Sequence, residues 1–91
     1  MKRIYILGDK LKCIKGCNSK EFDLRNPNLS ISVGDIAFVD EVKENNDITV
    51  LKLYVLNKHG EFTFIASDYS GNFSENLSIS EYFEKVEESE P

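Results

Sequence analysis

The stretch ITVLKLYVLNKHGEFTFIAS, residues 48–67, decides the fold. Two runs of β-branched and large apolar residues, 48–56 and 61–67, flank the polar tetrapeptide at 57–60. Side chains along a strand point alternately to its two faces, so the period-two pattern gives each run one apolar face. Gly60 can supply the positive φ that a tight turn requires. The pattern therefore predicts two antiparallel strands joined as a hairpin.

The same alternation extends along the chain in both directions. Upstream it predicts strands at 4–7, 10–13 and 36–39, and the turn formers between 16 and 32 predict a loop. Gly8-Asp9 reads as a bend between the first two strands.

Downstream of the hairpin, residues 78–83 predict one helical turn, which Ser78 or Ser80 caps. A short closing strand then follows at 84–87, around Val86.

The consistent apolar phase of these strands defines the expected core. Its members are Leu11, Ile36, Phe38, Leu53, Val55, Phe62, Phe64 and Val86. Five to six short antiparallel strands, with one helical turn before the last, predict an all-β fold, a small Src-homology-3-like barrel. We expect one domain over 1–87 and a disordered acidic tail over 88–91.

The apolar runs and the number of cysteines indicate the cellular compartment. The N-terminal apolar run, Ile4 to Leu7, is too short for the core of a signal peptide, and no stretch is long enough to span a membrane. Two cysteines are fewer than a small disulfide-dependent secreted domain uses. We therefore expect a cytoplasmic protein without membrane contact.

Three segments together resemble a family of short, functionally uncharacterised proteins from bacteriophages and their hosts: GDKLKCIKG (8–16), LSISVGDIAFVDEV (29–42) and EYFEKVEE (81–88). The family pattern is "GDxVxCI", then "LTVGKxYxV", then "FExVE". Ser32, Asp35 and Phe38 replace its Thr, Lys and Tyr, and the chain's middle, 43–80, is longer than in the usual member. The resemblance implies a phage-encoded or accessory protein in the host cytoplasm, and it carries over no functional residue.

The segment GDKLKCIKG is also similar to the first half of a KOW motif, which occurs in transcription elongation factors and ribosomal proteins. It has the Gly-Asp bend followed by inward apolar and outward basic residues. The second half of that motif needs further glycines, and CNSKEFDLRN stands there instead. This resemblance implies a nucleic-acid- or transcription-associated module as the alternative function.

Catalytic chemistry finds little support in the residue types present. Cys13 and Cys17 form C-x₃-C, but a zinc site wants four ligands and the single histidine, His59, lies in a distant turn. No serine-histidine-acid arrangement and no phosphate-binding glycine loop is present. We therefore expect no enzyme activity, no catalytic or metal site and no cofactor.

Charge is the most informative feature for partners. Residues 1–25 hold seven basic and three acidic side chains, whereas residues 26–91 hold four basic and thirteen acidic ones, within a net charge of −5. The acidic part predicts a protein partner, bound through Asp35, Asp40, Glu41, Glu44 and Asp47. The alternative surface for nucleic acid is a basic stripe of Lys10, Lys12, Lys15, Lys20 and Arg25. Nucleic acid is the less favoured partner because the whole chain is acidic, and we expect a monomer or a weak dimer.

Overall fold

A computed structural model describes residues 5–45, 48–69 and 78–86. The described chain consists of β-strands and two short 3-10 turns, which confirms the predicted all-β class. The elements are β1 (Lys10–Cys13), β2 (Cys17–Asn18), η1 (Ser19–Glu21), β3 (Ser30–Ile31), β4 (Ile36–Asn45), β5 (Ile48–Asn57), β6 (Gly60–Tyr69), η2 (Ile79–Glu81) and β7 (Phe83–Lys85). No helix among these residues is long and apolar enough to cross a membrane.

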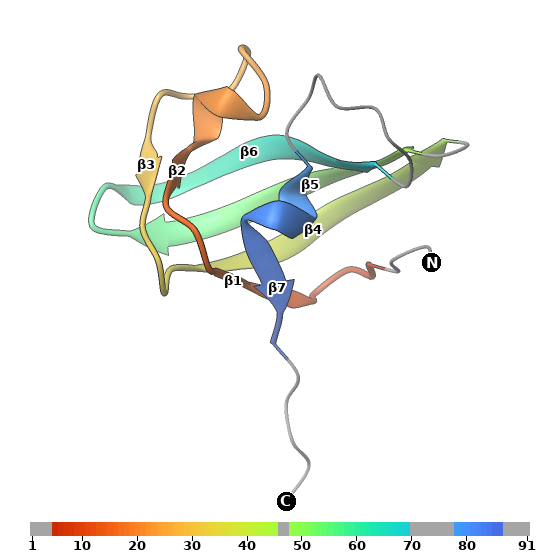
Figure 1. The fold of residues 1–91 in the computed structure, drawn as a ribbon, viewed down its shortest axis with the longest axis horizontal. Coiled ribbons are helices and arrows are strands. Elements are labelled where there is room, and N and C mark those ends of the chain that lie inside the picture. The colour runs from red at the N-terminus through yellow and green to blue at the C-terminus, as the bar shows by residue number, and fades with distance from the viewer. Residues whose placement is uncertain (1–4, 46–47, 70–77, 87–91) are drawn as a thin grey trace, which may run out of the picture.

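Five strands form one antiparallel sheet in the order β6-β5-β4-β1-β7, and β2 and β3 form a second, two-stranded sheet (Figure 1). The predicted hairpin is confirmed: Asn57 pairs with Gly60, whose φ is 96°. Asn45 pairs with Ile48, so β4, β5 and β6 run as a continuous meander. The predicted helical turn is also confirmed, as η2 directly before β7.

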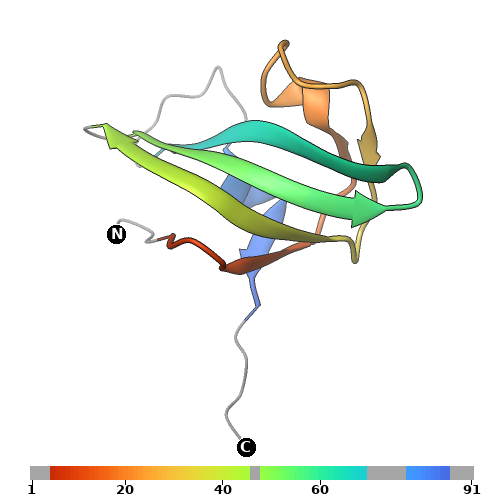
Figure 2. The ribbon, with the colours of Figure 1, turned by 180° about the vertical axis from the view of Figure 1, so that it is seen from behind.

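The core lies on one face of the meander. Figure 2 shows β4, β5 and β6 in front, with β7 and η2 behind them. Side chains from β1, β4, β5, β6 and β7 meet there, and the largest fully buried ones include Phe64, Leu11, Leu51, Leu53 and Val55. Four of the eight expected core residues are buried in this cluster: Leu11, Leu53, Val55 and Phe64.

The predicted core is wrong for β4, where Phe38 was expected to be buried. Phe38 points outward and is 36% exposed, whereas Ala37 and Val39 are buried. Residues 36–39 are apolar in both phases, so the sequence fits either orientation, and strand pairing decides: Ala37 lies between Leu11 of β1 and Val55 of β5. Directly opposite residues share one face, so Ala37 must follow its buried partners.

The remaining expected core residues lie at the margin or outside. Phe62 is half-buried and packs against the core, and Ile36 is half-buried on the outer side of β4. Val86 lies one residue after β7 and is exposed, although its amide still donates to the Lys10 carbonyl at 2.9 Å. The predicted tail at 88–91 lies outside the described residues.

The first predicted strand is absent from its described part, residues 5–7. Tyr5 is buried while Ile6 and Leu7 are exposed, so the segment does not alternate as a strand would. It turns at Gly8, which has a φ of 88°, and the Gly8 amide donates to the Val39 carbonyl at 2.9 Å. The bend at Gly8-Asp9 is confirmed, and the segment before it lies along β4.

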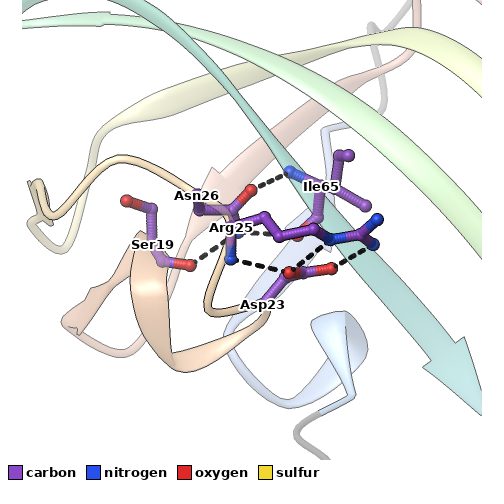
Figure 3. Close-up of polar contacts among 5 residues, drawn as sticks. All are labelled: Ser19, Asp23, Arg25, Asn26 and Ile65. Carbon is purple, nitrogen blue, oxygen red and sulfur yellow. Dashed lines mark hydrogen bonds and ion pairs between the residues drawn. The ribbon is translucent and has the colours of Figure 1, made fainter.

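The predicted loop at 16–32 is more ordered than expected, since it contains β2, η1 and β3. Asn26 holds it against β6 (Figure 3): its amide donates to the carbonyls of Ser19 at 2.7 Å and Ile65 at 2.9 Å. Its oxygen accepts the Ile65 amide at 2.8 Å. The Ser19 hydroxyl in turn donates to the carbonyls of Pro27 and Leu29. This buried network replaces the backbone pairing that an edge strand otherwise lacks.

Ser78 stands at the N-cap of η2 as predicted, but its side chain makes no capping hydrogen bond. Its hydroxyl donates instead to the Asp68 carboxylate at 2.6 Å. A parallel bridge between Ser67 and Ser78 accompanies this bond. Ser78 therefore ties the start of η2 to β6 rather than capping the turn.

Candidate partner-binding surface

A β-bulge in β4 brings two carboxylates together. Val39 pairs with Leu53, but the next pair is Glu41 with Lys52, so Asp40 is an extra residue in β4. A bulge bends its strand and re-aims the neighbouring side chains. The consecutive residues Asp40 and Glu41 are both exposed here, whereas regular alternation would turn one of them inward. The break in alternation therefore concentrates negative charge at one point of the surface.

A hollow of about 560 Å³ opens beside this bulge. It is lined by Tyr5, Ile6, Leu7, Asp40, Glu41 and Val42. Two hydrogen bonds, Gly8 N to Val39 O and Val39 N to Asp9 O, each 2.9 Å, fix the N-terminal segment beside β4. Ile6 and Leu7 are 60% and 67% exposed. The hollow thus combines an apolar side with a side that carries two carboxylates.

The five predicted acidic residues do not form one surface. Asp40 and Glu41 lie together, and the exposed Glu44 follows three residues further along β4. Asp35 lies before the opposite end of that strand, where its carboxylate accepts from the Ser32 amide at 2.9 Å and the Asn57 side chain at 3.1 Å. Asp35 is therefore part of the fold's own hydrogen bonding. Asp47 lies outside the described residues.

The basic stripe is also divided. Lys10 and Lys12 lie on one side of β1, opposite Phe38 and Ile36 of β4. Lys15 lies over the Tyr82 ring, with its Nζ 5.0 Å from the ring centroid.

The other two basic residues lie in the segment between β1 and β4. Lys20 is an exposed residue of η1. The Arg25 guanidinium donates to both oxygens of Asp23, from Nε at 3.0 Å and from Nη2 at 2.8 Å. These hydrogen bonds lower the pKa of Asp23 to about 2 (Figure 3). Only Lys10 and Lys12 therefore share a surface as predicted.

The two thiols are held in their protonated form. Burial raises the pKa of Cys17 to about 12 and also raises the pKa of Cys13, whose Sγ donates to the Lys15 carbonyl at 3.2 Å. Both are free thiols. Thiolates, not thiols, act as nucleophiles and metal ligands, so neither cysteine is prepared for such chemistry. Within the described ranges, no group of three or more His, Cys, Asp or Glu side chains is placed to hold a metal ion.

The sequence identified Asp40 and Glu41 but not the hollow beside them. The apolar wall was missed because Ile6 and Leu7 were expected in a strand. Only the apolar pair Ile6-Leu7, directly before the Gly8-Asp9 bend, could have pointed to it.

Comparison with known proteins gives no match: no family model fits the sequence, and no curated protein and no solved structure is recognisably similar to the chain.

Proposed function

We propose that this chain is a non-catalytic protein-interaction module, phage-encoded or accessory, that binds a basic segment of a host or phage protein. The observation that carries the proposal is the pair of carboxylates, Asp40 and Glu41, beside the hollow formed with Ile6 and Leu7. One version of this function is inhibition, in which the acidic surface competes with nucleic acid for a host protein.

A Src-homology-3-like barrel is the proposed architecture. It is supported by the antiparallel order β6-β5-β4-β1-β7 and by the single helical turn η2 before the last strand. The bridge between Ser67 and Ser78 supports it too, because it joins the edge strand β6 to the residue before η2 and brings the two ends of the sheet toward each other. Such barrels commonly present binding surfaces, although the fold alone assigns no function.

The chemistry of the hollow favours an arginine or lysine flanked by an apolar residue. The aliphatic stem of such a side chain can lie along Ile6 and Leu7 while its head reaches Asp40 and Glu41. Arginine suits the site better because its planar guanidinium can bind carboxylates through two parallel hydrogen bonds. The exposed carboxylates of β4, Asp40, Glu41 and Glu44, favour the approach of a basic partner to this strand.

Selection from a displayed library of random peptides tests this proposal without a known partner. Peptides retained by the wild-type chain should be enriched in arginine or lysine next to a bulky apolar residue. Binding of a selected peptide should fall at least tenfold in Asp40→Lys, mainly through slower association, because rim charges act on the association rate.

The matched control is Lys20→Glu, which changes a charge on the exposed turn η1 and not among the residues that line the hollow. It should leave the peptide affinity unchanged. Peptides that lack basic residues, or whose affinity survives Asp40→Lys, would show that the carboxylates do not bind the partner.

The KOW-like alternative would rest on Lys10 and Lys12, the two stripe residues that share a face. A gel shift with nucleic acid over a range of salt concentrations separates it from the proposed function. Only a nucleic-acid-binding module should give a complex that weakens steeply as salt rises.

A further inference from the structure

The outer face of the main sheet, the side turned away from the core, carries a group of apolar side chains. Leu56 is 61% exposed, Phe38 is 36% exposed, and Ile36 and Tyr54 are half-buried. The rings of Phe38 and Tyr54 lie side by side, with 6.5 Å between their centroids. Single exposed apolar residues are normal, but a contiguous group marks an interaction surface. Figure 2 shows the three strands that form the centre of this face.

Strand register arranges the face in rows, because directly opposite residues lie on the same side of a sheet. Lys12 is opposite Ile36, and Leu56 is opposite Glu61. The pair Ala37–Val55 places Ile36 beside Leu56 one residue further along. The first row, from β1 to β6, is therefore Lys12, Ile36, Leu56, Glu61.

Further rows follow along the strands, and the fourth contains Lys43, Val50 and Ser67. The second contains Lys10, Phe38, Tyr54 and Thr63, and the third contains Glu41, Lys52 and Ile65. The first row reads basic, apolar, apolar, acidic. The third has its acidic residue on β4 and its basic residue on β5. Charge is thus distributed in opposite senses on the two sides of the line between β4 and β5.

Such a pattern is complementary to itself. A two-fold axis parallel to the strands, midway between β4 and β5, places β4 of one copy against β5 of the other and β1 against β6. Ile36 then meets Leu56 and Phe38 meets Tyr54 of the facing copy. The same rotation sets each Lys12 against a Glu61.

The third row obeys the same symmetry. Each Glu41 meets a Lys52 of the facing copy. A dent of about 80 Å³ at this row, lined by residues that include Glu41, Lys52 and Ile65, offers room for a side chain of that copy. We infer that two copies of this chain associate through the outer face as a two-fold dimer.

A second copy fits this face better than a nucleic acid does. Glu41 and Glu61 lie in the same rows as the lysines, and Glu84 of β7 is opposite Lys12. These carboxylates repel phosphates, whereas the two-fold arrangement pairs Glu41 and Glu61 with lysines. The face is small, since four strands at about 4.8 Å spacing are roughly 19 Å across. A dimer of this size is at the low end of specific interfaces, and the experiment below is designed around a weak Kd on the order of 10 µM.

Sedimentation equilibrium of the full chain between 1 and 500 µM (about 0.1 to 50 times that Kd) tests the inference. We expect a monomer–dimer equilibrium. Leu56→Lys should raise the Kd at least tenfold, because it puts a charge in the apolar centre. The matched control, Leu24→Lys, changes an 82% exposed leucine in the segment between β1 and β4 and should leave the Kd unchanged.

Charge exchange tests the symmetry itself. Lys12→Glu and Glu61→Lys should each weaken the dimer, since each sets like charges against each other. The double variant restores an opposite pair at both symmetry-related contacts and should recover most of the affinity. Circular dichroism confirms that every variant is folded.

Three results would overturn the dimer. The first is a wild-type chain that stays monomeric at 500 µM. The second is a dimer that Leu56→Lys leaves intact, or a double variant no tighter than its parents, which would place the contact elsewhere. The third is a single-stranded oligonucleotide that binds the wild-type monomer and is lost on Lys12→Glu, which would make the face a nucleic-acid surface.

Discussion

Replacing Asn26 by alanine should be among the most damaging polar substitutions in this chain. The side chain is 6% exposed and makes three hydrogen bonds of 2.7 to 2.9 Å, two to the backbone of Ile65 and one to the Ser19 carbonyl. A buried hydrogen bond contributes about 0.5–1.5 kcal/mol net, and the backbone groups left without partners add to the loss. We expect the free energy of unfolding to fall by about 3 kcal/mol.

Urea unfolding followed by circular dichroism measures this loss. A domain of this length has a total stability of roughly 5–14 kcal/mol, so about 3 kcal/mol is a large part of it. With a denaturant slope near 1.2 kcal/mol/M, the midpoint should fall by about 2.5 M. Asn28→Ala is the matched control, because Asn28 is an exposed asparagine two residues away, and its midpoint should stay within about 0.4 M of wild type.

Asn26→Asp separates hydrogen bonding from packing, since it keeps the size and the acceptor for the Ile65 amide. It replaces the donor by an oxygen that faces the carbonyls of Ser19 and Ile65. Burial and these carbonyls should raise the folded-state pKa of the new carboxyl above its unfolded value. The loss of stability of Asn26→Asp relative to wild type should therefore shrink as the pH falls and the carboxyl gains a proton. Two results would contradict this role of Asn26. One is a free energy of unfolding for Asn26→Ala within 0.5 kcal/mol of that for Asn28→Ala. The other is a loss of stability in Asn26→Asp that does not depend on pH.

Three further predictions concern the core, an ion pair and the thiols. Phe64→Ala should cost about 3–5 kcal/mol in urea unfolding because Phe64 is 1% exposed, whereas Phe38→Ala should cost only about 1 kcal/mol; equal losses would contradict the observed phase of β4. Asp23 should titrate near its pKa of about 2 by NMR and return toward 3.8 in Arg25→Ala. Since the folded pKa is the lower one, its contribution to stability should be present above pH 4 and lost as the pH falls toward 2, and an unchanged titration in Arg25→Ala would contradict the pairing. Cys17, with its pKa raised to about 12, should react with iodoacetamide at pH 8 about a thousandfold more slowly in the folded than in the urea-unfolded chain, while rapid labelling of the folded chain would show that its thiolate is accessible.

Local pattern predicted several elements correctly. The hairpin of β5 and β6 follows from the alternation of 48–56 and 61–67, because each run places three successive apolar residues on one face and the turn between them ends in a glycine. The helical turn before β7 and the bend at Gly8 likewise depend on residues within a few positions of one another. These elements could be predicted correctly because they depend on residues that are close together in the sequence.

The candidate surfaces could be predicted only in part. Asp40 and Glu41 were recognisable as adjacent acids. Their common exposure, however, depends on a bulge that forms only when β4 pairs with β5. Asp35 looked equivalent to them, but the turn before β4 and the distant Asn57 occupy its carboxylate. Nothing in the sequence separates these roles, because each depends on which segment folds beside the residue.

The sequence by itself determined the all-β class, the central hairpin and the separation of charge along the chain, since composition and period-two alternation are properties of contiguous residues. Only the tertiary structure decided the phase of β4, where four successive apolar residues satisfy either face until Leu11 and Val55 pair on both sides. It also decided that Asn26 closes the edge of β6 at Ile65, 39 positions away, and that the rows of the outer face combine four strands. Contacts of this kind form between segments far apart in the chain, so no local pattern encodes them.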